Sequence, residues 1–88
     1  MSSAEKLPSQ NLIYEALLAV LSGAEDGLHI KEIEKLVAEK LSLTMAQQEL
    51  MHKGNRTMLG YKLAWARTSA KKKRLISQVR ASVWKLSR

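Results

Sequence analysis

Lysine and arginine side chains dominate the second half of the chain, and such a run of cations is suited to binding a polyanion. Residues 44–88 hold eleven Lys or Arg and a single acid, Glu49, whereas residues 1–43 hold four Lys and seven acids. From Lys53 to Arg88 no acidic residue occurs. An unbalanced positive surface attracts nucleic acid, so the sequence predicts such a partner. The alternative is a solvated basic face that only keeps the chain soluble.

Groups that could catalyse a reaction are sparse. The chain has one Asp, Asp26, and no Cys, and most of its Glu fall on the expected solvent faces of two helices. A carboxylate cluster for Mg²⁺-dependent phosphodiester cleavage is therefore not indicated. His29 and His52 are 23 residues apart with no Cys near either, which argues against zinc. We predict a binding module with no enzymatic activity, no cofactor and no small-molecule substrate.

The length and the apolar runs bound the class of protein. Eighty-eight residues form one small domain, which we place at residues 9–88 behind a flexible tail at residues 1–8. No signal-peptide pattern opens the chain, and the longest uninterrupted apolar run, Ala16 to Leu21, is too short to span a bilayer. The absence of Cys fits a reducing compartment. We expect a soluble, cytoplasmic domain without a membrane partner.

Apolar spacing predicts the helices that must carry the cations. A first helix is expected at about 9–22 and a second at about 31–41, with a short extended piece at residues 28–30 between them. Thr44 can cap a short helix through Met51. A third long helix begins at Asn55 or Arg56 and runs to about Lys73. Its buried stripe is Leu59, Leu63, Ala66 and Ala70.

After Arg74 the apolar period changes to two, which is typical of strands. Residues 75–79 and 82–86 predict a hairpin about a turn at Arg80-Ala81, with Trp84 and Leu86 turned inward. The order helix, short strand, helix, helix, hairpin is that of a winged helix-turn-helix. We therefore predict a mainly α fold with a three-helix core and a small β-hairpin as its wing.

Two strings in the sequence resemble a known family. The run Leu63-Ala-Trp65-Ala-Arg67-Thr through Leu75-Ile76, followed by Val83-Trp-Lys-Leu-Ser87, is similar to the amino-terminal domain of Mrr-type restriction proteins. The earlier Ile30-Lys-Glu-Ile33-Glu segment is similar to the second helix of that family. The resemblance covers about residues 10–87 and implies a winged-helix DNA-binding module. In the family, this module precedes a nuclease domain that attacks methylated or otherwise modified foreign DNA.

Two expectations follow from how the chain departs from the family pattern. Arg74 and Ser82 stand where the pattern has Gly, and Gly is the residue that adopts positive φ without strain. We therefore expect the loop before the hairpin and the wing turn to be shaped differently here. No nuclease follows in this sequence, so the chain is either a stand-alone reader or one domain of a longer protein that carries a nuclease.

The binding model follows from the fold. The third helix is expected in the major groove and the wing on the backbone or minor groove of double-stranded DNA. Lys62 and Arg67 suit guanine or phosphate, whereas the four consecutive cations from Lys71 to Arg74 suit phosphates. The candidate DNA-contacting residues are Arg56, Tyr61, Lys62, Trp65, Arg67, Ser69, Lys71, Lys72 and Arg80.

Trp65 is the candidate for contact with a modified base. An apolar ring on a polar, cationic face can pack on a base methyl group, such as that of N6-methyladenine, which the family context favours. The alternative is that Trp65 packs between the third helix and the wing. Trp84, by its strand alternation, is expected in the core.

Other functions remain open at this point. A winged helix also serves as a protein-interaction or dimerisation module, and the acidic first half could pair with the basic half of another copy. A sequence-specific transcription regulator is a further alternative. RNA binding is disfavoured because the aromatic residues form no stacking platform.

Overall fold

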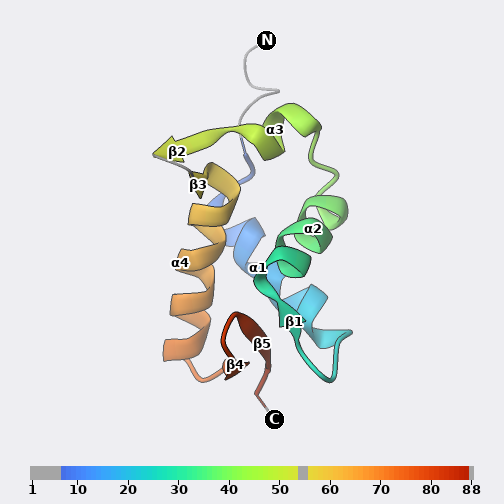
Figure 1. Cartoon of the computed structure of the whole chain (residues 1–88), viewed down its shortest axis with the longest axis vertical. Helices are drawn as coiled ribbons and strands as arrows, with labels where there is room; N and C mark the ends of the chain where they lie inside the picture. Colours follow the sequence, from blue (N-terminus) through green and yellow to red (C-terminus); the bar gives the residue numbers. More distant parts are fainter. Residues whose placement is uncertain (1–6, 54–55, 88) are drawn as a thin grey trace.

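The structure is a computed structural model that describes residues 7–53 and 56–87. In chain order its elements are α1 (Gln10–Ser22), β1 (Leu28–His29), α2 (Ile30–Lys40), α3 (Met45–Glu49), β2 (Met51–Lys53), β3 (Arg56–Thr57), α4 (Met58–Lys72), β4 (Ile76–Arg80) and β5 (Val83–Leu86). Helix α4 runs along one side of the molecule and α2 along the other, with α1 between them and the hairpin at the lower end (Figure 1). The prediction of a small, mainly helical domain with a β-hairpin is confirmed.

The first two helices form where the apolar spacing predicts them. The Ser9 hydroxyl accepts a hydrogen bond from the Leu12 N–H at 3.3 Å and so caps α1. Helix α2 has a capping box in which His29 Nδ1 accepts from the Lys31 N–H, while Glu32 Oε1 accepts from the His29 N–H. Leu7, inside the predicted tail, is partly buried and packs against the core. Residues 1–6 of that tail lie outside the described residues.

The segment between α2 and α4 differs from the prediction. Thr44 does cap a short helix, but α3 ends at Glu49, and Met51 belongs to β2. Strand β2 pairs antiparallel with β3 in a two-stranded sheet that we did not predict. Leu50 has an extended backbone, and its carbonyl accepts a hydrogen bond from the Met58 N–H at 2.7 Å. This bond holds the start of α4 against the end of α3.

Helix α4 begins later than predicted. Asn55, one of the two expected starts, lies outside the described residues, and Arg56, the other, lies in β3. The N-cap is Thr57, whose hydroxyl accepts a hydrogen bond from the Gly60 N–H at 3.1 Å. Thr57 has an extended backbone and caps the helix, so the strand ends and the helix starts there.

The hairpin joins a three-stranded sheet of order β1-β5-β4. Strand β5 lies in the middle, pairing antiparallel with both neighbours, and the Ile30 N–H donates to the Ser82 carbonyl at 2.9 Å. The connection is Ala81-Ser82 rather than the predicted Arg80-Ala81, because Arg80 still pairs with Val83 across an irregularity in the register. The sheet thus fixes the hairpin to the start of α2.

The expectation that the two loops are reshaped is wrong. Arg74 and Ser82 both have φ of 62°, the left-handed conformation that the family pattern meets with Gly. Arg74 directly follows the C-cap Lys73 of α4. The Leu75 N–H donates to the Ala70 carbonyl and the Arg74 N–H to the Lys71 carbonyl, both at 2.9 Å, which is the Schellman pattern. Because these bonds fix the chain direction, Arg74 is held in the left-handed region.

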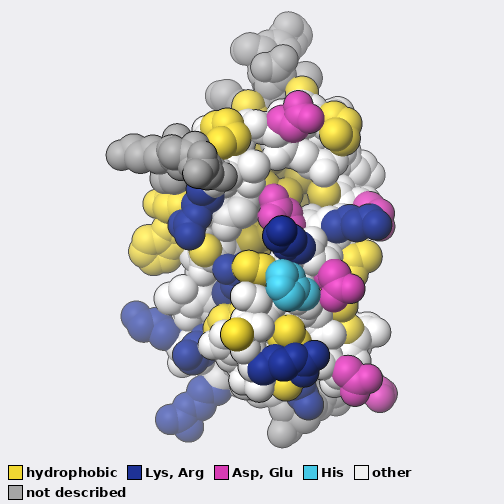
Figure 2. All heavy atoms as spheres, viewed as in Figure 1, with side chains coloured by type: hydrophobic (Ala, Val, Ile, Leu, Met, Phe, Trp, Pro, Cys, Tyr) yellow, Lys and Arg dark blue, Asp and Glu magenta, His cyan; other side chains and the backbone are white. Residues whose placement is uncertain are grey.

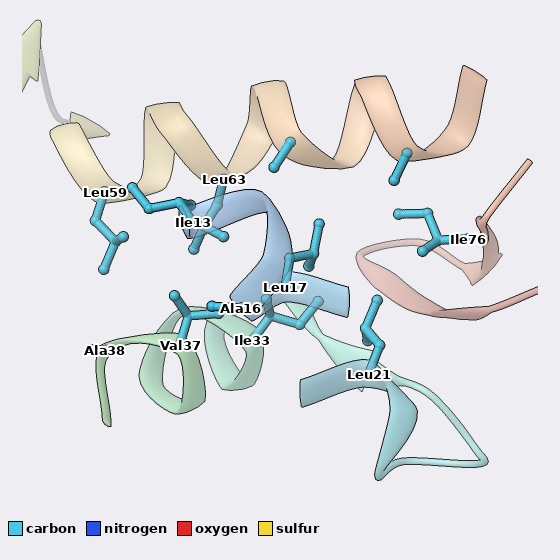
Figure 3. Close-up of a cluster of buried hydrophobic side chains, with 12 residues drawn as sticks. Ile13, Ala16, Leu17, Leu21, Ile33, Val37, Ala38, Leu59, Leu63 and Ile76 are labelled. Atoms are coloured by element: carbon cyan, nitrogen blue, oxygen red, sulfur yellow. The ribbon is translucent and has the colours of Figure 1, made fainter. Parts of the chain in front are cut away.

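Helix α1 supplies the centre of the core. Its Ile13, Leu17 and Leu21 point toward the apolar stripes of the neighbouring elements in Figure 3. The predicted stripe of α4 is fully confirmed, since Leu59, Leu63, Ala66 and Ala70 are all buried. Trp84 and Leu86 are partly buried and pack against this core, as expected. Val83 is more buried than either, because the Gly27 loop covers the other side of β5.

Candidate nucleic-acid interface

Helix α4 presents an outward strip opposite its buried stripe. Tyr61, Trp65, Thr68 and Lys72 fall within this strip by the helical period. The Trp65 side chain is 57% exposed, so the alternative that it packs between the helix and the wing is wrong. Thr68 donates to the Ala64 carbonyl one turn earlier at 3.0 Å. A large exposed ring among polar and cationic side chains is available for contact with another molecule.

A cationic flank joins α4 to the hairpin. The Arg67 guanidinium carbon lies 6.0 Å from the centroid of the Trp84 ring, and the Lys71 ammonium nitrogen lies 5.8 Å from it. Both distances suit cation–π attraction between each charge and the Trp84 ring. Trp84 thereby has two roles, because its ring also packs against the core. The flank and the hairpin form one continuous surface.

Arg67 is one of the partly buried residues among the predicted contacts. Burial lowers the pKa of its guanidinium below the ordinary value, the nearby Arg56 lowers it further, and Glu34 opposes both effects. A guanidinium nevertheless stays charged at physiological pH. The side chain is only partly exposed, so its position is more restricted than that of a free surface cation.

Glu34 of α2 forms a hydrogen bond with the residue that caps α4. Its Oε2 accepts a hydrogen bond from the Thr57 hydroxyl at 3.1 Å, and that hydroxyl also caps α4. Gly60 makes room for the Thr57 hydroxyl, because a Cβ there would lie only 3.1 Å from Thr57 Oγ1, whereas its distance of 3.8 Å from Glu34 Oε1 would be an ordinary contact. The bond therefore fixes the start of α4 against α2. We had not predicted a role for Glu34, because its helical face gives no sign of a partner 23 residues away.

Two hollows lie on either side of Trp65. The larger, about 490 Å³, lies between α1 and α4, and the smaller, about 250 Å³, lies beside the start of α4. The larger is lined by Gln10, Asn11, Tyr14, Tyr61, Trp65, Ala66, Ser69 and Lys73. The smaller is lined by Arg56, Tyr61, Ala64, Trp65 and Thr68. Three aromatic rings thus line one cleft, which we call the aromatic cleft.

The predicted contact residues are distributed over these surfaces. Tyr61, Trp65 and Ser69 line the aromatic cleft, Arg56 lines the smaller hollow, and Arg67 and Lys71 form the flank beside Trp84. Lys72 and Arg80 are exposed, the latter at the hairpin turn. Lys62 is partly buried, and its backbone carbonyl accepts from Gln10 Nε2 at 2.8 Å.

Charge is unevenly distributed over the face that Figure 2 shows. Lys and Arg side chains gather over the α4 side and the hairpin end, while Asp and Glu lie mainly on the α2 side. The exposed cations at the end of α4 are Lys71, Lys72, Lys73 and Arg74. They also complement the negative end of the helix dipole. On this face, Lys and Arg side chains are therefore more frequent around α4 and the hairpin than around α2.

The described residues contain no group of three or more His, Asp or Glu side chains that could hold a metal ion. Within the same part of the chain, every helix is too short or too polar to cross a membrane.

The α1 residues of the aromatic cleft were not predicted as site residues. Gln10 and Asn11 lie at the start of α1, far from the basic half of the sequence, and only packing against α4 brings them there. Tyr14 is partly buried and lines the cleft. Lys73 was expected to contact phosphate, and its ammonium lies 5.3 Å from the Tyr14 ring centroid.

Comparison with known proteins gives one match. A family model described as the Mrr N-terminal domain matches residues 11–88. No curated protein and no solved structure matches the chain significantly. The family match covers every helix and strand described above except the first residue of α1.

Proposed function

The chain belongs to the Mrr N-terminal domain family, a module of Mrr restriction proteins, and from this premise we propose that it binds double-stranded DNA as a winged helix-turn-helix. Helix α4 is the recognition helix of this proposal, and the β4–β5 hairpin is the wing. In this proposal the domain contributes binding to the restriction protein.

One observation carries the proposal. Arg67 and Lys71 both lie over the ring of Trp84, so the cations of the helix and those of the hairpin belong to one surface. A protein that binds a duplex tightly contacts several phosphates of its backbone at once. A helix in the major groove with a hairpin on the neighbouring phosphates meets that need. Arg80, at the hairpin turn, reaches the backbone or minor groove.

Base recognition falls to the outward strip of α4. Trp65 carries the largest apolar surface there and contacts a base methyl group in the groove, such as that of N6-methyladenine. Tyr61 and Lys72 lie on the same strip and contact the bases or phosphates beside it. In this proposal the domain directs a restriction protein to modified DNA.

The salt dependence of binding tests the proposal. About five phosphate contacts predict a slope of log affinity against log salt near −4 to −5 for a short duplex, measured by fluorescence anisotropy. The double variant Arg67→Gln/Lys71→Gln makes the slope shallower by about two. Lys40→Gln is the matched control, because it removes one positive charge from the last turn of α2. A flat salt response of the wild-type protein refutes duplex binding, and an oligomer that forms only at low salt without DNA favours the interaction-module alternative.

A further inference from the structure

The aromatic cleft between α1 and α4 has features that groove binding does not use. Its volume of about 490 Å³ lies within the range of roughly 300–1,000 Å³ that is typical of small-molecule sites. One wall comes from Asn11 and Tyr14 of α1, and the other comes from Tyr61 and Trp65 of α4. The wall on α1 is not part of the proposed recognition helix. The cleft therefore suits a group that leaves the base stack and enters the protein.

The lining favours a planar, heteroaromatic occupant. Tyr14, Tyr61 and Trp65 offer ring faces or edges on which a base stacks, and stacking of this kind tolerates every base. Asn11 adds an amide whose Nδ2 donates to Glu15 Oε2 at 3.5 Å, and the second N–H and the carbonyl oxygen of this amide match the edge of adenine. The side chain of Gln10, also in the lining, is held across the cleft by its bond to the Lys62 carbonyl.

Charge decides between a cationic and an anionic ligand. Aromatic cages also bind methylated ammonium groups, but Lys73 already lies over the Tyr14 ring and repels a second cation. The same ammonium attracts a phosphate. The Tyr14 hydroxyl is buried, and no hydrogen-bond partner for it exists among the described residues, so a polar ligand atom that reaches it would satisfy it.

We infer that the aromatic cleft binds a single unpaired nucleotide, with the base stacked between the α1 and α4 walls and the phosphate held by Lys73. The inference rests on the proposed duplex binding and extends it, because the nucleotide is one displaced from the duplex that α4 contacts. Displacing a base costs stacking and pairing energy, which is lowest at a mismatch or a damaged base. The domain therefore prefers duplexes that contain a weakly paired position.

Affinity for three duplexes of one sequence tests the inference, using a fully paired duplex, one with a single bulged adenosine and one with a bulged abasic site. We expect the bulged adenosine to bind about tenfold more tightly than the other two. Tyr14→Phe and Asn11→Ala, both on α1, abolish this preference and leave affinity for the paired duplex unchanged. Lys72→Ala is the matched control, since Lys72 neighbours Lys73 outside the cleft lining, and it weakens all three duplexes equally.

Equal binding of the bulged adenosine and the abasic bulge overturns the inference, while a retained salt slope on the paired duplex leaves the proposed function intact. If the paired duplex is not bound at all, the cleft is tested directly by NMR titration with deoxyadenosine monophosphate. Changes in amide chemical shift that are confined to α1 and α4 then support nucleotide binding in the cleft, even though the duplex is not bound. If phenyl phosphate causes chemical-shift changes as large as those of deoxyadenosine monophosphate, the cleft does not recognise the base and the inference is overturned.

Discussion

The ammonium nitrogen of Lys71 lies 5.8 Å from the centroid of the Trp84 ring, so the last turn of α4 and the middle strand of the sheet meet at one aromatic ring. This contact connects two segments whose separate roles follow from the sequence, a basic helix and a hairpin. The ring also packs against the core, so the position of the hairpin depends on the same side chain that receives the cations. Stability and the proposed DNA binding are therefore linked at Trp84.

Replacing Trp84 tests this link. Trp84→Ala removes a large ring that is only partly buried, so the free energy of unfolding should fall by about 2–3 kcal/mol, below the value of ~3–5 kcal/mol typical of full core positions. Trp84→Phe keeps a ring face for Arg67 and Lys71 and should cost less than half as much. Denaturant titration measures both. Equal losses in the two variants would contradict a role for the ring in holding the cations.

The cap at the start of α4 provides a second prediction. Thr57→Ala removes the hydroxyl that caps the Gly60 N–H and donates to Glu34, so the free energy of unfolding should fall by about 1–2 kcal/mol. Thr68→Ala is the control within the same helix, because the exposed Thr68 hydroxyl contacts only the preceding turn and its loss should change stability by less than ~0.5 kcal/mol. Thermal unfolding of both variants compares them. Similar shifts would show that the Glu34 contact adds nothing.

The sequence predicts the elements that depend on local periodicity. The stripe from Leu59 to Ala70 gave the buried face of α4, and the change of period after Arg74 gave the two strands of the hairpin. These predictions succeed because the apolar side chains of a helix or strand turn toward the core, so their spacing shows which face is buried. The short β2–β3 sheet could not be predicted in this way, because strands of two and three residues are too short to show an apolar period.

The candidate site is less predictable from the sequence. The cations of the acid-free segment are visible as a run, but the aromatic cleft needs Gln10, Asn11 and Tyr14 to lie against α4, about fifty residues away in sequence. That contact depends on the packing of α1 across the core, which no local pattern encodes. Trp65 shows the same limit, because its position on the helix left base contact and packing both open, and only the structure shows that it is more than half exposed.

The positive φ angles at Arg74 and Ser82 lead to a third prediction. A residue with a Cβ in the left-handed region costs roughly 1–2 kcal/mol. Replacing it with Gly removes this strain, but Gly loses about 0.5–1 kcal/mol more backbone entropy on folding. Arg74→Gly should therefore raise the free energy of unfolding by roughly 0.5–1 kcal/mol. Ser82→Gly should act similarly. Arg80→Gly is the control in the same hairpin, since Gly in a strand destabilises it. Denaturant midpoints that fall for all three would contradict the strain at residues 74 and 82.

A pair of glycines gives the fourth prediction. Gly27 has φ of 92°, and a Cβ there would lie 2.9 Å from the Trp84 carbonyl oxygen, so Gly27→Ala should destabilise the domain by about 2 kcal/mol or more and loosen β5. Gly23 ends α1 with a negative φ, and a Cβ there would meet only the Val20 carbonyl at 3.9 Å. Gly23→Ala should therefore be neutral or stabilising by up to ~1 kcal/mol. Calorimetric unfolding separates the two, and equal losses would contradict the close approach at residue 27.

The proposed reading of a modified base gives the last prediction. Trp65 is more than half exposed, so Trp65→Ala should change the free energy of unfolding by less than ~1 kcal/mol. If the ring buries one base methyl group, worth about 0.8 kcal/mol, the variant should lose roughly a fourfold preference for adenine-methylated over unmethylated duplex. The salt slope should stay the same, because no phosphate contact is removed, whereas Lys72→Ala should reduce the slope by about one and keep the preference. Competition binding with the two duplexes measures both quantities. A preference that survives Trp65→Ala would assign the reading of the methyl group to another residue.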